Sequence, residues 1–303
     1  MTSTRLIDPI GSFPQEQILG IGRTGLVVRQ GQVAVKLPLR WSTSSHEDVE
    51  ANIESLQHEQ AIYRRLGKCA GVVPFLGCSE TATRLRLMEN GDLRSYLSRN
   101  KPSKSLQLSW FRVMAHTLAH IHDQRIIVAD IASRNFLLDS DLTIKMCDFT
   151  ESVDLPLDAC METADYGGYS IQTDIGQLGA VMYEVVVGEK CEFDIFKNVP
   201  PELSGGSWPR REDLPSTQDV WLGSIIERCW TKGAFRSAHD LWKELESVEV
   251  ENDPAEQLWS SRRLLSMMRY VIPVQWHDSL HPAVMMMVTF GAIAGYVWSR
   301  RHN

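Results

Sequence analysis

Val-Ala-Asp-Ile-Ala-Ser-Arg-Asn at residues 128–135 and Cys-Asp-Phe-Thr at residues 147–150 decide how this chain is to be understood. In the first stretch, the carboxylate of Asp130 stands five residues before the amide of Asn135. In the second, the carboxylate of Asp148 precedes a phenylalanine. Amide and carboxylate oxygens are hard ligands that suit magnesium, and a second carboxylate can accept a proton. The two stretches therefore predict a site that combines a base with a metal.

The composition is that of a folded, soluble protein. The chain has 303 residues, of which 43% are hydrophobic and 23% are charged, which is enough for one large or two smaller domains. The net charge of −7, without a basic patch, argues against nucleic acid as a partner. Six scattered cysteines without C-x-x-C spacing argue against a zinc site or a disulfide framework and favour a reducing, intracellular compartment.

The first ninety residues favour β-strands. Residues 18–37 alternate apolar strands with glycine turns and predict an antiparallel meander. Residues 54–66 show the apolar spacing of an amphipathic helix. Two further strands are expected over residues 72–76 and 84–88.

After Leu93 the spacing of the apolar residues becomes that of helices. Ser109 can cap a helix whose apolar side chains begin at Trp110, and residues 136–138 with 143–146 predict a small hairpin. Further helices are expected over residues 174–187, 220–230 and 238–245. A strand-rich part followed by a helix-rich part predicts an α+β fold with two lobes.

A glycine-rich turn, Gly20-x-Gly22-x-x-Gly25-x-Val27, is a candidate loop for cradling phosphates. Glycines let the backbone approach phosphate oxygens and point its N–H groups at them. An ordinary hairpin turn is the alternative. A dinucleotide fingerprint needs a helix after the glycines, and a strand follows here, so that interpretation is excluded.

Lys36 lies inside the apolar strand Val-Ala-Val-Lys-Leu. Such a lysine is either solvated at a strand edge or paired with an anionic group. Glu59 in the following helix is the best candidate for its partner, with Glu54 and Glu50 as alternatives. A lysine held in this way could be aimed at the phosphates of a nucleotide.

The order of these features resembles that of the eukaryotic protein kinase domain. Glycine loop, Val-Ala-Val-Lys, helical Glu, Asp-x-x-x-x-Asn and Asp-Phe-x follow one another as in that family. The resemblance runs from about Leu19 to Leu245. Three further segments agree with it: residues 90–97, residues 174–179, and Cys229-Trp230 followed by Arg236.

The resemblance implies a bilobal fold, with a small β-rich N-terminal lobe that includes one long helix and a larger helical C-terminal lobe. It also implies ATP and Mg²⁺ as cofactors. It assigns the base to Asp130 and the metal ligands to Asn135 and Asp148. The remaining positions carried over are Lys36 and its partner Glu59, Arg134 beside the base, the phosphate-loop residues Gly20, Gly22 and Gly25, and the apolar adenine positions Leu19, Val27, Ala34 and Leu137.

The chain departs from the family pattern beside these residues. Val128 and Ala129 replace the His-Arg that precedes the base, and that Arg normally grips a phosphorylated residue. Thr150 replaces the Gly of Asp-Phe-Gly and restricts the backbone there. These changes put the usual phosphorylation switch in doubt and leave the catalytic groups in place.

The segment after Asp148 is short. If Glu162 stands for the family's Ala-Pro-Glu glutamate, about fourteen residues separate it from Asp148, and Arg236 would be its ion-pair partner. Ala132 and Arg134 are closer to the tyrosine-kinase form of the catalytic loop than to the serine/threonine form. Two residues do not settle the specificity.

The C-terminal segment 283–298 contains no charged residue. The uncharged window from Ser279 to Ser299 would extend about 31 Å as a helix, close to the hydrocarbon thickness of a bilayer. Residues 283–299 are therefore a candidate tail anchor in an intracellular membrane. A helix that folds back onto the body is the alternative.

The sequence predicts an ATP-dependent protein kinase that phosphorylates a Ser, Thr or Tyr hydroxyl. A pseudokinase scaffold and a small-molecule kinase are the alternatives. The expected organisation is an N-terminal extension (1–13), two lobes (14–88 and 89–247), an acidic linker (248–257) and a helical tail (258–303). The sequence indicates neither a particular protein substrate nor an oligomeric state.

Overall fold

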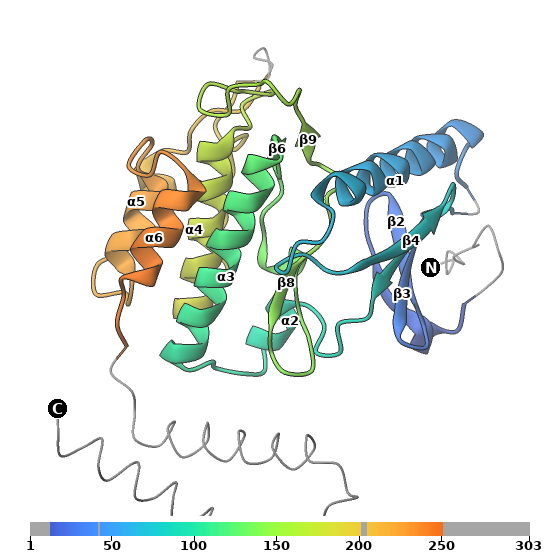
Figure 1. The fold of residues 1–303 in the computed structure, drawn as a ribbon, viewed down its shortest axis with the longest axis horizontal. Helices are drawn as coiled ribbons and strands as arrows, with labels where there is room; N and C mark the ends of the chain where they lie inside the picture. The colour runs from blue at the N-terminus through green and yellow to red at the C-terminus, as the bar shows by residue number, and fades with distance from the viewer. Residues whose placement is uncertain (1–12, 42, 201–204, 251–303) are drawn as a thin grey trace, which may run out of the picture. The chain divides into compact units, whose positions relative to one another are not determined.

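The computed structural model describes residues 13–41, 43–200 and 205–250, and its helices and strands lie in one compact unit, residues 1–249. The five-stranded sheet and helix α1 lie at the right of Figure 1, and the helices α3 to α6 lie at the left, which confirms the two-lobed α+β fold. Within the described residues, no helix combines the length and the apolar character needed to cross a bilayer. The candidate anchor 283–299 lies outside those residues and stays a prediction.

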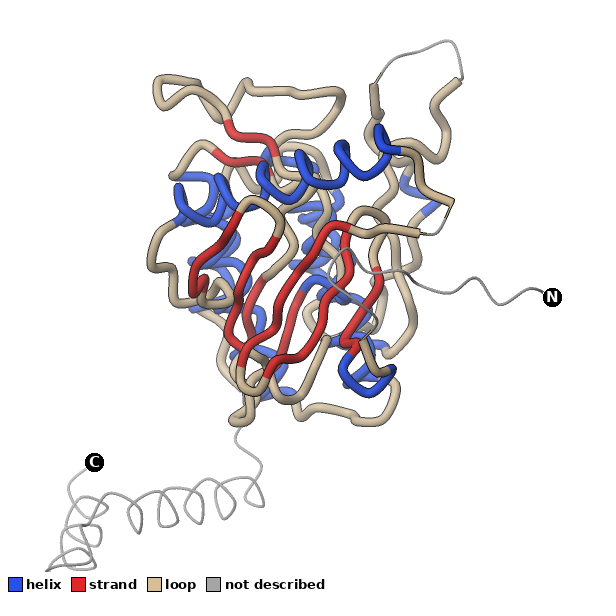
Figure 2. The backbone as a smooth tube through the Cα atoms, turned by 90° about the vertical axis from the view of Figure 1, so that its right-hand side faces the viewer, coloured by secondary structure: helices blue, strands red, loops and turns tan. Residues whose placement is uncertain are grey.

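The N-terminal lobe is built on a five-stranded antiparallel sheet with the order β1-β2-β3-β5-β4. One helix, α1, lies across this sheet (Figure 2) and packs against β3 and β5. The elements of this lobe are η1 (Gln15–Gln17), β1 (Ile18–Ile21), β2 (Gly25–Gln30), β3 (Val33–Pro38), α1 (His46–Leu66), β4 (Phe75–Ser79) and β5 (Ala82–Arg86).

The predicted meander over residues 18–37 is confirmed as β1, β2 and β3. Alternate side chains of β2 and β3 form a buried cluster on one face: Leu26, Val28, Val35, Leu37 and Leu39. Because side chains alternate across a strand, this register turns the side chains of Val27, Ala34 and Lys36 toward the opposite face. The functional groups of the meander therefore share one side of the sheet.

Helix α1 begins at His46, eight residues before the start predicted from the apolar spacing. A capping box sets this start: Ser45 Oγ accepts from the Asp48 N–H at 3.1 Å, and Asp48 Oδ2 accepts from the Ser45 N–H at 2.9 Å. The first turns are largely exposed, so they lack the apolar pattern on which the prediction depended.

The two strands predicted over residues 72–76 and 84–88 lie at different positions, as β4 (Phe75–Ser79) and β5 (Ala82–Arg86). Val72 and Val73 precede β4 and lie outside this sheet. They contact Met146 of the other lobe, where the Val73 N–H donates to the Met146 carbonyl at 3.0 Å. Leu87 and Met88 belong to the connection between the lobes. Both wrong boundaries come from apolar residues that are buried by tertiary contacts rather than by this sheet.

The C-terminal lobe is mainly helical. Helix α3 begins at Lys104 with Ser103 as its cap, so the predicted cap, Ser109, lies inside the helix. The buried helix α4 packs against α3 and α5. The helices of this lobe are α2 (Leu93–Leu97), α3 (Lys104–Asp123), η2 (Ser133–Asn135), α4 (Ile171–Val187), η3 (Arg211–Asp213), α5 (Gly223–Trp230) and α6 (Ala238–Glu246).

Short strands flank the stretches 128–135 and 147–150. The predicted hairpin is confirmed as β7 (Phe136–Leu138) and β8 (Ile144–Met146), which connects Asn135 to Asp148. The strand β6 (Ile126–Ile127) pairs with β9 (Val153–Asp154). These two pairings bring the stretches 128–135 and 147–150 together.

Candidate functional site

A cleft of about 1010 Å³ lies between the lobes. Its walls come from the glycine turn, β3, α1, the interlobe connection, the loop 128–135 and the segment after β8. All the site residues predicted from the sequence line this one cleft: Leu19, Gly20, Gly22, Gly25, Val27, Ala34, Lys36, Glu59, Asp130, Arg134, Asn135, Leu137 and Asp148.

The glycine turn joins β1 to β2 and is closed by a hydrogen bond from the Gly22 N–H to the Gly25 carbonyl at 2.8 Å. A Cβ at Gly25 would come within 3.0 Å of the Lys36 Cε. Gly25 therefore leaves the space through which the lysine side chain reaches the cleft. A Cβ at Gly20 would meet no atom within 4 Å, so no neighbouring atom requires a glycine at that position.

Lys36 is buried and lies between two carboxylates. Its Nζ is 2.9 Å from Glu59 Oε2 and 2.8 Å from Asp148 Oδ1. Of the three candidate partners in α1, the structure places Glu59 beside the lysine. Glu54 and Glu50 are exposed, and Glu50 instead pairs with His46.

The charges of this network control each other's ionisation. Burial opposes the charge on Lys36, but the carboxylates of Glu59 and Asp148 outweigh that effect and raise the lysine pKa well above its ordinary value. Burial alone would raise the pKa of Asp148, whereas the Lys36 charge and the hydrogen bonds from Lys36 and Thr150 bring it below the ordinary value. At neutral pH the site therefore presents an ammonium and an ionised aspartate.

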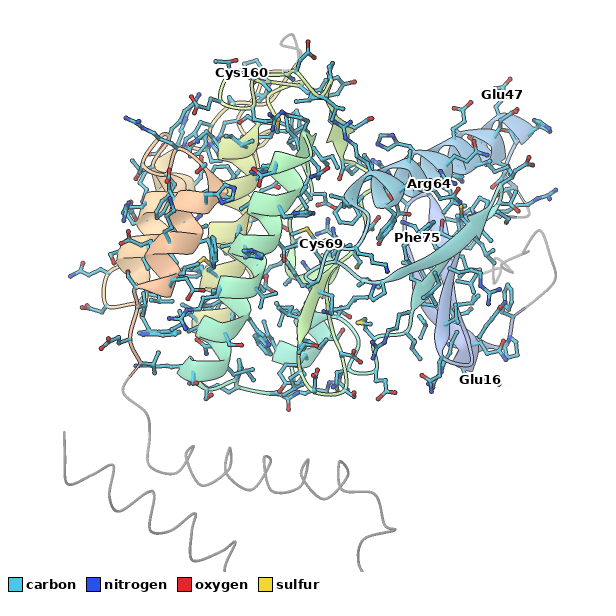
Figure 3. The ribbon with its side chains drawn as sticks, viewed as in Figure 1. Glu16, Glu47, Arg64, Cys69, Phe75 and Cys160 are labelled. Atoms are coloured by element: carbon cyan, nitrogen blue, oxygen red, sulfur yellow. The ribbon has the colours of Figure 1, made fainter. Side chains whose placement is uncertain are left out.

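An aromatic stack connects α1 to the segment that follows Asp148. The ring of Tyr63 lies parallel to that of Phe75 at 5.5 Å and edge-on to that of Phe149 at 5.1 Å. Phe75 comes from β4, next to α1 (Figure 3). The Phe149 N–H also donates to Glu59 Oε1 at 3.2 Å. The stack and this bond keep Glu59 and Asp148 on either side of Lys36.

We expect Tyr63→Phe to raise the free energy of unfolding by about 1 kcal/mol, because the Tyr63 hydroxyl is buried without a hydrogen-bond partner among the described residues. Tyr63→Ala should lower it by about 3 kcal/mol, because it removes a buried ring from the stack. Urea denaturation of both variants checks the pair of predictions. A lower free energy of unfolding in Tyr63→Phe than in the wild type would contradict the first.

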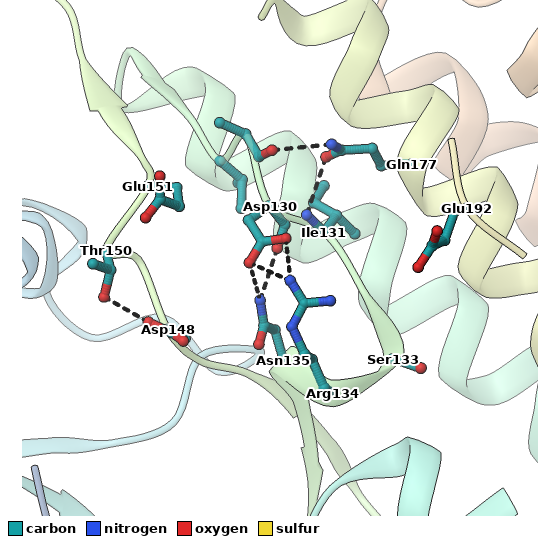
Figure 4. Close-up of polar contacts among 12 residues, drawn as sticks. Asp130, Ile131, Ser133, Arg134, Asn135, Asp148, Thr150, Glu151, Gln177 and Glu192 are labelled. Atoms are coloured by element: carbon teal, nitrogen blue, oxygen red, sulfur yellow. Dashed lines mark hydrogen bonds and ion pairs between the residues drawn. The ribbon is translucent and has the colours of Figure 1, made fainter. Parts of the chain in front are cut away.

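Asp130 accepts hydrogen bonds from two neighbours (Figure 4). Arg134 Nη2 donates to Asp130 Oδ1 at 2.5 Å and to Oδ2 at 2.7 Å. Asn135 Nδ2 donates to Asp130 Oδ2 at 3.0 Å and to the Asp130 carbonyl at 2.9 Å. Two donors meet at Oδ2 and one at Oδ1, so Oδ1 keeps acceptor capacity for a further proton donor.

Helix α4 holds the backbone of the loop that carries Asp130. The buried Asp174 accepts from the N–H groups of Val128 and Ala129 at 2.8 and 2.9 Å. Gln177 accepts from the Ile131 N–H and donates to the Ala129 carbonyl, both at 3.0 Å (Figure 4). These bonds keep Ala129 at a φ of 66°, a left-handed conformation that costs a non-glycine residue free energy.

The oxygens of Asn135 and Asp148 fit the predicted metal. Asp148 Oδ2 and Asn135 Oδ1 accept no hydrogen bond from the described residues, because the neighbouring donors bind other atoms. The described residues contain no group of three or more His, Cys, Asp or Glu placed to hold a metal ion. A magnesium ion here would thus complete its shell with water and phosphate oxygens, as Mg²⁺ commonly does in nucleotide sites.

Several cleft residues were not singled out from the sequence. Leu85 of β5 and Met88 of the connection between the lobes line it, and the Met88 N–H has no backbone partner among the described residues. Thr150, noted in the sequence only as a restriction on the backbone, also lines the cleft, and its Oγ1 accepts from Lys36 Nζ at 3.0 Å. The Asn90-Gly91-Asp92 turn begins the segment 90–97, which agreed with the family resemblance, and it marks the end of the connection.

The segment after Asp148 is attached to α1 by contacts with its main chain. His58 Nε2 lies 2.6 Å from the Ser152 carbonyl, and Arg65 Nη2 donates to the Leu155 carbonyl at 2.7 Å. These two contacts fix the main chain of the segment at Ser152 and Leu155 to the second half of α1.

The predicted ion pair between Glu162 and Arg236 is wrong. Among the described residues, neither side chain takes part in an ion pair, and Glu162 lies exposed in a turn two residues after Cys160, which Figure 3 labels. Gln172 of α4 instead joins this region, donating to the Phe235 carbonyl at 2.9 Å and accepting from the Gly233 N–H at 3.0 Å. These bonds attach the start of α4 to the loop before α6 and do not involve Glu162.

A family model described as protein tyrosine and serine/threonine kinase matches residues 20–237. A probable serine/threonine-protein kinase of Dictyostelium discoideum is 27% identical over 199 residues, which cover 59% of this chain and 40% of the relative. The human tyrosine-protein kinase Srms is 25% identical over 199 residues, covering 59% and 38%. The probable L-type lectin-domain containing receptor kinase S.5 of Arabidopsis thaliana is 28% identical over 259 residues, covering 72% and 38%. The chain spans about two fifths of the length of these curated relatives.

Proposed function

The chain belongs to the protein tyrosine and serine/threonine kinase family, and from this membership we propose that it is an ATP-dependent kinase acting on a protein hydroxyl. The observation that supports catalysis best is the complete set of polar groups in one cleft. Lys36 is paired with Glu59, and Asp130 has acceptor capacity left at Oδ1. The metal-binding oxygens of Asn135 and Asp148 line the same cleft.

In the proposed reaction, the substrate hydroxyl attacks the γ-phosphorus of ATP and its proton passes to Asp130 Oδ1. The bond between the γ-phosphorus and the bridging oxygen breaks, and ADP leaves. Arg134 keeps the Asp130 carboxylate oriented, and Lys36 supplies positive charge for the phosphates. Magnesium, when bound by Asp148 and Asn135, neutralises charge on the phosphate oxygens.

The apolar side chains that line the cleft suit an adenine ring. Leu19, Val27 and Ala34 come from the sheet of the N-terminal lobe, and Leu137 comes from β7 of the other lobe. The Met88 N–H, which has no backbone partner among the described residues, offers a donor at the edge of this region. An adenine ring placed there would be covered by both lobes, and the phosphates of the nucleotide would extend toward Lys36.

The proposal is tested by following labelled γ-phosphate with the purified full-length protein, Mg²⁺ and a mixture of peptides containing Ser, Thr or Tyr. Label should be transferred to a peptide or to the protein itself, and Asp130→Asn serves as the control for contaminating kinases. Equal labelling by both proteins would overturn the proposal. Binding of Mg-ATP without transfer would instead favour a nucleotide-binding scaffold, and transfer to a small molecule but to no peptide would change the substrate class.

A further inference from the structure

We propose that the hydroxyl of Thr150 positions Asp148 for its cation, a role that rests on the proposed function and specifies how this chain orients its metal ligand. Thr150 Oγ1 donates to Asp148 Oδ1 at 2.7 Å and accepts from Lys36 Nζ at 3.0 Å. Lys36 Nζ in turn donates to the same Oδ1 at 2.8 Å. The three groups form a closed triangle of hydrogen bonds.

The triangle selects one of the two oxygens of Asp148. The terminal torsion of an aspartate is soft, so a carboxylate held at a single point can rotate and exchange its oxygens. Here both donors bind Oδ1, which leaves Oδ2 without a hydrogen bond among the described residues. The Thr150 hydroxyl is thus the second donor to Oδ1, so an exchange of the two oxygens would break two hydrogen bonds instead of one, and Oδ2 is presented to a cation.

The hydroxyl also supports an unfavourable backbone conformation. Asp148 has a φ of 61°, in the left-handed region that is costly for residues with a side chain. The bond between the side chains of residues 148 and 150 closes a local loop around Phe149, which is fully buried. A glycine at position 150 could not form this bond. Thr150 therefore couples the backbone turn to the direction of the carboxylate.

The test compares Thr150→Val, which keeps the shape of threonine and removes the hydroxyl, with Thr150→Ser, which keeps the hydroxyl. Calorimetric titration of the full-length protein with ADP, once with Mg²⁺ and once with EDTA, gives the factor by which the metal tightens nucleotide binding. We expect Thr150→Val to reduce this factor at least about tenfold and Thr150→Ser to stay within about threefold of the wild type. ADP affinity in EDTA should change little in either variant.

An unchanged or larger factor in Thr150→Val would overturn the proposal, and an equal loss in Thr150→Ser would show a packing role instead. If Thr150→Val does not fold by its thermal unfolding curve, Thr150→Ala replaces it with the same expectation. Wild-type protein that binds no ADP with Mg²⁺ would also overturn it. Wild-type protein that shows the metal effect but transfers no phosphate would contradict the proposed kinase function and leave the role of Thr150 supported.

Discussion

Asp130→Asn is expected to lower the rate of phosphoryl transfer by at least about a hundredfold, because an amide cannot accept the proton of the attacking hydroxyl. The substitution keeps the shape of the side chain. Its remaining oxygen can still accept from Arg134 or Asn135, which bond to the Asp130 carboxylate in the wild type. The affinity for Mg-ADP should stay within about threefold, since the lysine network and the oxygens proposed to bind the metal belong to other residues.

Initial rates with labelled ATP and calorimetric titration with Mg-ADP separate these two effects. Asp158→Asn is the matched control, because it removes the same charge from an exposed position of the segment after Asp148. The control should keep the wild-type rate. Asp130→Asn with a rate near that of the wild type would show that this carboxylate is not the base. A parallel loss of nucleotide affinity would show that it supports the structure of the site instead.

Glu59→Leu is expected to lower the free energy of unfolding by about 3 kcal/mol, the lower end of the range for breaking a buried ion pair. Both side chains are buried, with Glu59 1% and Lys36 11% exposed. The substitution removes a partner of Lys36 and the acceptor of the Phe149 N–H. The remaining contact of Lys36 with Asp148 limits the loss.

A double-mutant cycle isolates the pair from the packing change. Lys36→Met removes the other charge, and the double variant Glu59→Leu with Lys36→Met leaves no unpaired group at either position. We expect the double variant to be more stable than the sum of the single losses predicts, by at least about 1 kcal/mol in urea denaturation. Additive losses would mean that the two groups stabilise the fold independently, and the interpretation of Lys36–Glu59 as a coupled buried pair would be wrong.

Much of the N-terminal lobe could be predicted because its signals are local. Alternation of apolar residues and turn glycines specify β1, β2 and β3 within a span of about twenty residues. The same reasoning misplaced β4 and β5 by two or three residues. Val72, Val73, Leu87 and Met88 are apolar and buried although they lie outside these strands, and the apolar pattern of a short segment does not distinguish the two cases.

The sequence by itself determined which chemical groups the site contains and in what order they occur. Lys36, Asp130, Asn135 and Asp148 could be named from their spacing, because each lies in a short stretch of recognisable pattern. The tertiary structure alone decided which atoms meet. It selected Glu59 over Glu54 and Glu50, and it brought Lys36 to Asp148 across 112 residues.

Two further outcomes also depended on the folded chain. Thr150 was noted in the sequence as a restriction on the backbone, and the structure shows its hydroxyl bonded to both Lys36 and Asp148. Glu162 and Arg236 were expected to pair, and both are exposed without an ion pair among the described residues. Local patterns reflect interactions between near neighbours in the chain, whereas the choice of partner depends on how two lobes and their loops pack. For that reason the site residues could be named from the sequence, whereas their hydrogen bonds could be known only from the structure.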